Sequence, residues 1–87
     1  MRFTIVKLQK AIDDFENLSA EQQSAVNADY TTIQTRGIEF VKRRFLQDDI
    51  FEIKTDDVRS LFKYAENQII IIGLVYTKRP RRHQNRC

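Results

Sequence analysis

The spacing of apolar residues changes along the chain. Alternation around Phe3 and Ile5 predicts a short first β-strand, because successive side chains of a strand point to opposite faces. Apolar residues then recur every three or four positions over residues 8–18 and again over 26–33, which predicts two amphipathic helices. Between them, Ser19-Ala-Glu-Gln22 matches a capping box, so one helix should end and the next begin within a few residues. Gly37 is a natural stop for the second helix.

Strand signals dominate the second half of the chain. Runs at 50–54, 58–64 and 69–76 are rich in β-prone residues and separated by turn sequences. The last run is apolar on both sides, which predicts a central strand covered on both faces at least in part. Residues 38–49 fit either a continuing helix or the start of a strand, and the pattern leaves both open.

These elements predict an α+β fold. We expect an N-terminal strand, a two-helix hairpin, and then a largely antiparallel sheet of about four strands with the helices packed on one face. Residues 1–87 should form a single domain, with 81–87 as a basic tail whose order the sequence leaves open. The sheet face opposite the helices would be free for a ligand.

Composition indicates the size of the core and the cellular compartment that we expect for this domain. Apolar residues make up 41% of the 87-residue chain, enough for one small core. The longest apolar run, 69–75, is far short of the roughly 20 residues that cross a bilayer, so no membrane partner is expected. With one cysteine, Cys87, and no secretory pattern in the first residues, we expect a cytoplasmic protein.

Charge is unevenly distributed. The net charge is only +3, yet residues 78–87 contain five basic residues and no acidic one. This asymmetry favours a polyanionic partner such as a nucleic acid, although a tail that merely improves solubility would look the same.

Several kinds of active site find no support in the sequence. There is no cluster of His and Cys for zinc, and two glycines cannot make a phosphate-binding loop. Three Asp-Asp pairs could be imagined as magnesium ligands, but positions on a helix surface and in turns explain them better. We therefore expect no metal and no cofactor.

A set of cations remains as the candidate for chemistry. Lys54 and Arg59 flank one predicted turn, and an antiparallel third strand would bring Lys78 and Arg79 back toward Arg59. Cleavage of RNA by its own 2′-hydroxyl needs a base, an acid and positive charge on the phosphorane, and such a set can supply that charge. The alternatives are structural: a cross-strand ion pair of Arg59 with Glu52 or Glu66, and simple solvation of Lys54.

The order of motifs in the C-terminal half resembles the RelE/ParE superfamily of bacterial toxins, including its HigB-like branch. The resemblance rests on Phe51-Glu-Ile-Lys54, Arg59-Ser-Leu-Phe62, Ile69-Ile-Ile-Ile72 and Lys78-Arg79, together with Phe15-Glu-Asn-Leu18 before the polar turn. It covers most of the chain and lies in the order and spacing of the pieces.

This resemblance implies a toxin of a type II toxin-antitoxin system that cleaves mRNA on the ribosome without metal. Lys54, Arg59 and Arg79 would then be catalytic, and His83 would take the proton-transfer role that other members give to a C-terminal tyrosine or histidine. RNA-backbone contacts would come from Lys63, Lys78, Arg81 and Arg82. The implied partners are mRNA, the ribosome and a cognate antitoxin in a hetero-oligomer.

Three alternatives stay open at the level of sequence, the third being a toxin-like protein that binds its antitoxin but has lost activity. A ParE-type toxin shares the fold but inhibits DNA gyrase, and a non-catalytic nucleic-acid-binding domain would need only the basic tail. The second lacks the exposed aromatic pattern of the common RNA-binding sheets, because Phe51, Phe62 and Tyr64 are expected in the core as readily as on a surface.

Overall fold

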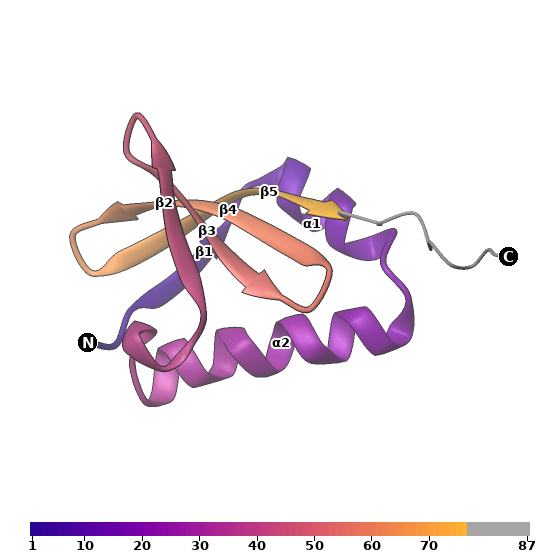
Figure 1. Cartoon of the computed structure of the whole chain (residues 1–87), viewed down its shortest axis with the longest axis horizontal. Helices are drawn as coiled ribbons and strands as arrows, with labels where there is room; N and C mark the ends of the chain where they lie inside the picture. The colour runs from indigo at the N-terminus through magenta and orange to yellow at the C-terminus, as the bar shows by residue number, and fades with distance from the viewer. Residues whose placement is uncertain (77–87) are drawn as a thin grey trace, which may run out of the picture.

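The computed structural model describes residues 1–76 and contains two helices beside one five-stranded sheet (Figure 1). The predicted α+β fold is confirmed. The elements in chain order are β1 (Thr4–Lys7), α1 (Gln9–Glu16), α2 (Ala20–Thr35), a 3-10 turn (Ile38–Phe40), β2 (Arg43–Gln47), β3 (Ile50–Thr55), β4 (Val58–Ala65) and β5 (Gln68–Tyr76).

The strands lie in the order β1-β5-β4-β3-β2. β2 to β5 form an antiparallel meander, whereas β1 pairs with β5 in parallel, Thr4 opposite Gln68 and Lys7 opposite Ile71. β5 therefore has a neighbour on each side. Its run of branched apolar residues agrees with this central place, as the sequence predicted.

The connection between the helices is the predicted capping box. The Ser19 hydroxyl accepts a hydrogen bond from the Gln22 amide at 3.1 Å, and the Gln22 side chain accepts one from the Ser19 amide at 2.9 Å. At the other end, α2 stops at Thr35, and Gly37 follows with a φ of 130°, which a residue with a side chain rarely adopts. Both ends of α2 are thus determined by local sequence.

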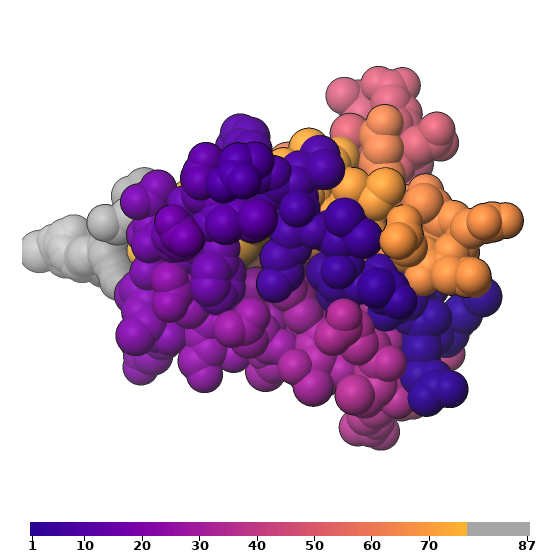
Figure 2. Space-filling view, turned by 180° about the vertical axis from the view of Figure 1, so that it is seen from behind, coloured from indigo at the N-terminus to yellow at the C-terminus, as the bar shows by residue number. Residues whose placement is uncertain are grey.

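One face of the sheet is covered by helix. Val26, Tyr30 and Ile33 of α2 are buried in one core with Ile53 of β3 and Phe62 of β4. The Tyr30 hydroxyl donates a 2.8 Å hydrogen bond to the hydroxyl of buried Ser60. Seen from behind, residues of β1 and the two helices form most of the surface (Figure 2).

α1 is anchored to β5. The Asp14 carboxylate accepts hydrogen bonds from the Leu74 amide at 2.9 Å and from the Lys10 ammonium at 2.7 Å. The bond from Lys10, and then that from Leu74, hold the pKa of Asp14 below its usual range. Neither helix of the described chain is long and apolar enough to cross a bilayer.

Residues 38–49, which the sequence left open between helix and strand, form the 3-10 turn and β2. Phe45 lies opposite Phe51 with ring centroids 5.2 Å apart, so pairing with β3 decides for a strand. A turn with positive φ at Asp48 and Asp49 joins the two strands. β2 to β5 are thus the four antiparallel strands, and the N-terminal strand β1 joins them in one sheet, of which β2 forms an edge.

Candidate nucleic-acid interface

The two faces of β4 differ in character. Ser60 and Phe62 are fully buried on the side of α2. Arg59, Leu61 and Lys63 alternate with them and point to the opposite face, because successive side chains of a strand alternate. α2 packs on the Ser60 side and leaves the Arg59 side uncovered. Lys54, Arg59 and Lys63, three of the residues predicted for function, lie on this uncovered face.

Lys54 and Arg59 are directly opposite each other on β3 and β4. Opposite residues of an antiparallel pair have Cβ atoms about 5 Å apart and share a face of the sheet. The predicted proximity of these two cations is therefore observed, while their role in catalysis stays a prediction.

The Arg59 guanidinium is held in place by the turn between β3 and β4. Its Nη1 donates to the carbonyl oxygens of Asp56 at 2.6 Å and Val58 at 3.2 Å. Its Nε lies 3.8 Å from Oε2 of Glu52, and only 22% of the side chain is exposed. The Glu52 ion pair weighed from the sequence thus exists, whereas Glu66 lies in the turn between β4 and β5, at the other end of β4.

Arg44 on β2 is a residue that sequence reasoning missed. It lies opposite Glu52, and its Nη2 is 3.0 Å from Glu52 Oε2. Its side chain is 62% exposed. A strand interpretation of 43–47 would have revealed it, because Arg44 and Leu46 then alternate with Arg43 and Phe45.

Glu52 joins the two arginines. The residue is only 5% exposed, and its Oε2 is the buried side-chain oxygen that lacks a hydrogen bond among the described residues. Arg44 and Arg59 approach this oxygen from neighbouring strands. The centre of the uncovered face is therefore one buried carboxylate between two guanidinium groups, with Lys54 on the same face of the sheet.

The C-terminal candidates can be placed only in part. Lys63 is exposed on the same face, opposite Ile70. Lys78, Arg79, Arg81, Arg82 and His83 lie outside the described residues. The last described pairs are Arg59 with Val75 and Val58 with Tyr76, so β5 runs toward the end of the sheet that holds Arg59.

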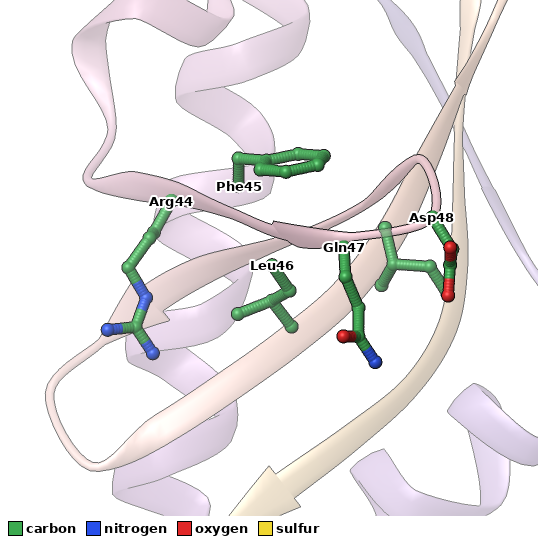
Figure 3. A pocket seen from close by; sticks show the side chains of 6 residues that line it. Arg44, Phe45, Leu46, Gln47 and Asp48 are labelled. Carbon is green, nitrogen blue, oxygen red and sulfur yellow. The ribbon is translucent and has the colours of Figure 1, made fainter.

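A shallow hollow of about 600 Å³ adjoins the interface at β2. Figure 3 shows Arg44, Leu46 and Gln47 on one side of the strand and Phe45 on the other. Asp48 and Ile50 complete its lining. The apolar side chains beside Arg44 extend the cationic surface by an uncharged contact area.

The acidic pairs have structural positions. Asp48, Asp49 and Asp56 occupy turns with positive φ, a backbone conformation that aspartate tolerates better than most residues. Asp14 caps an amide at the edge of β5. Within residues 1–76, no three His, Cys, Asp or Glu side chains are grouped so as to hold a metal ion.

Comparison with solved structures identifies the architecture. No protein-family model matches the sequence, and no curated protein matches it significantly. Three solved toxin-antitoxin complexes contain a chain of the same shape. They are RelBE2 of Mycobacterium tuberculosis (14% identity, 87% of this chain and 99% of that chain, TM-score 0.71), archaeal RelE-RelB of Pyrococcus horikoshii (12%, 92% and 100%, TM-score 0.69) and YoeB-YefM of Staphylococcus aureus (18%, 87% and 98%, TM-score 0.67).

This chain has the RelE-like fold. Nearly the full length of each matched chain and 87–92% of this chain are covered, so the similarity extends over most of the fold. At 12–18% identity the similarity is one of fold, and it agrees with the resemblance seen in the sequence. Within the RelE-like fold, the cations described above lie on the sheet face opposite α2.

Proposed function

We propose that this protein is the toxin of a type II toxin-antitoxin system and an endoribonuclease that cleaves mRNA on the ribosome. The observation that carries the proposal is the Lys54–Arg59 pair on the uncovered face of a RelE-like sheet. Arg44 adds a third cation to the same face. Such a surface suits a phosphodiester, which needs positive charge at its oxygens.

The proposed reaction uses the RNA's own 2′-hydroxyl as nucleophile. The 2′-oxygen forms a bond to phosphorus, the bond from phosphorus to the 5′-oxygen breaks, and the products carry a 2′,3′-cyclic phosphate and a 5′-hydroxyl. One proton leaves the 2′-hydroxyl and another reaches the 5′-oxygen. Lys54 would assist the attacking hydroxyl or bind the phosphate, and His83 would serve in proton transfer.

Arg59 and Arg79 would stabilise the phosphorane and the leaving group. Two backbone carbonyls fix the Arg59 guanidinium before any ligand arrives, and a donor positioned in advance needs no reorganisation when charge develops. Arg79 follows Tyr76 by three residues, and Tyr76 ends a strand paired beside Arg59. Lys63, Lys78, Arg81 and Arg82 would contact the RNA backbone without reading its sequence.

The proposed partners are mRNA, the ribosome and a cognate antitoxin. The three similar structures are complexes of a toxin with its antitoxin, and we extend that arrangement to this chain by analogy. The cytoplasm, where translation takes place, is the proposed compartment. No metal or cofactor is assigned to the reaction.

Expression in bacteria tests the proposal. The wild-type chain should arrest growth, and primer extension on cellular mRNA should show cuts within translated codons. Arg59→Ala and Lys54→Ala should each reduce cleavage about 100-fold or more, the usual effect of removing one group that stabilises the transition state. Arg36→Ala, which removes an equal charge at the end of α2, is the matched control and should cleave like the wild type.

Other outcomes would point to other functions. Growth arrest that disappears in a strain with resistant gyrase, without mRNA cuts, would favour a ParE-type toxin. RNA binding with neither arrest nor cuts would leave a non-catalytic binding domain. Normal cleavage by Arg59→Ala would refute the assignment of the site.

A further inference from the structure

Glu52 is an unusual residue for the centre of a cationic surface. It is the acidic residue between Arg44 and Arg59, 3.0 Å from the first and 3.8 Å from the second. At 5% exposure it is as buried as much of the core, although it lies on the face opposite α2. A buried carboxylate is unfavourable unless its oxygens are paired and hydrogen-bonded.

The pairing of Glu52 is incomplete. Its Oε2 has ion-pair contacts with both guanidinium groups but no hydrogen bond of normal geometry within residues 1–76. Arg44 is largely exposed, and an exposed arginine adds little to the stability of an ion pair. Arg59 is fixed mainly by the carbonyls of Asp56 and Val58. A contribution to the stability of the fold therefore does not explain why a buried glutamate is found at position 52.

Competition with a ligand gives a better account. A carboxylate and a phosphate offer a guanidinium the same feature, two anionic oxygens at the spacing of its forked donors. In the described structure the carboxylate of Glu52 has the place between Arg44 and Arg59 that a phosphate oxygen would otherwise take. Because Arg59 keeps its Nη1 on backbone carbonyls, an exchange of anions would move Arg44 and leave Arg59 in position.

We propose that Glu52 is a built-in competitor of RNA phosphate for Arg44 and Arg59, and so lowers the affinity of this face for RNA. The inference rests on the proposed function, because it takes RNA as the ligand. A phosphate that reaches the arginines must replace the carboxylate and meets its negative charge. RNA that makes many contacts with the protein can offset the repulsion between its phosphate and Glu52. RNA that makes few contacts cannot, so Glu52 disfavours unspecific RNA binding.

Equilibrium binding of RNA that cannot be cleaved tests this role apart from catalysis. The probe is a labelled single-stranded RNA with 2′-O-methyl groups, and the measurement is fluorescence anisotropy between 50 and 400 mM salt. Glu52→Gln keeps the shape of the side chain and removes its charge. We expect it to bind about 10-fold more tightly than the wild type at the lowest salt, and log K should fall more steeply with log[salt], by about 0.7 for each added phosphate contact.

Two further variants make the result specific. Glu66→Gln changes the net charge equally but at the other end of β4, and its affinity and salt slope should stay close to those of the wild type. Arg44→Ala should weaken binding more in the Glu52→Gln background than in the wild type, because only there is Arg44 released from the carboxylate. Glu52→Met, of similar volume and without charge, should repeat the gain and replaces Glu52→Gln if that variant fails to fold.

The outcomes separate this inference from the proposed function. Wild-type binding that is salt-dependent, with no gain in Glu52→Gln or Glu52→Met beyond that of Glu66→Gln, would overturn the inference alone. Loss of RNA cleavage in Glu52→Gln at unchanged affinity would make Glu52 a proton acceptor and would also overturn it. RNA binding by none of these proteins would overturn the inference, while the proposed function would still be decided by growth arrest and by the cuts in cellular mRNA.

Discussion

The two faces of β4 are built from neighbouring residues under opposite conditions. On the covered face, Ser60 and Phe62 are excluded from water, and the hydroxyl of Ser60 has a partner in Tyr30. On the uncovered face, Arg59 is partly exposed and Lys63 is exposed. Alternate residues of one strand thus lie in the hydrophobic core and on a solvent-exposed cationic surface.

The faces differ most in how their buried polar groups are satisfied. The covered face pairs the hydroxyls of Tyr30 and Ser60, while Glu52 on the uncovered face has ion-pair contacts and an oxygen without a hydrogen bond among the described residues. A buried polar atom without a hydrogen bond is rare in proteins and needs an explanation, which the proposed competition with RNA phosphate would supply for Glu52. The contrast agrees with a stable core on the covered face and with the RNA interface that we propose on the uncovered face.

Substitution of adjacent residues on β4 should expose this contrast most strongly. Phe62→Ala leaves a cavity in the core and should lower the free energy of unfolding by about 3–5 kcal/mol. Leu61→Ala, on the uncovered face and only partly buried, should lower it by about 1 kcal/mol. Urea unfolding followed by circular dichroism measures both. Equal effects of the two substitutions would mean that the faces do not differ in packing as described.

Much of the fold could be predicted because its signals are local. The capping box at Ser19 and the stop at Gly37 depend on residues within one turn of helix. The strand over 43–47 could not be predicted, because its sequence permits both helix and strand and only the pairing of Phe45 with Phe51 decides. The parallel pairing of β1 with β5 joins residues more than 60 positions apart, which no local pattern records.

The site follows the same rule. Lys54 and Arg59 could be brought together from the sequence, because one short turn separates them. The place of Arg44 beside Glu52 depends on the register of β2, which was not assigned. Predictions of which side chains lie close together were therefore correct across a hairpin turn and incomplete where a strand had not been predicted.

The buried hydroxyl pair of the covered face gives the next largest effect. Tyr30→Phe leaves the Ser60 hydroxyl buried without its partner and should lower the free energy of unfolding by about 1–2 kcal/mol. RNA binding on the opposite face should not change. A variant as stable as the wild type would show that water or a rearranged side chain satisfies Ser60.

The same tyrosine predicts how stability depends on alkaline pH. Burial raises the pKa of Tyr30 to about 12, whereas an unfolded tyrosine titrates near 10. The folded state binds the proton more tightly, so this contribution to stability is complete below about pH 10 and is lost as pH rises toward 12. Unfolding measured across this range should show a decline that is weaker in Tyr30→Phe. Parallel declines in both proteins would assign the effect to other groups.

Lys63 should show the smallest effect on stability and a clear effect on binding. It is exposed on the uncovered face, so Lys63→Ala should change the free energy of unfolding by less than about 0.5 kcal/mol. If Lys63 contacts one phosphate, its loss should reduce the slope of log K against log[salt] for single-stranded RNA by about 0.7. Arg36→Ala, which removes an equal charge at the end of α2, should leave that slope unchanged. Equal changes in the two variants would mean that RNA binding depends on the net charge of the protein. The uncovered face would then not be a specific RNA interface.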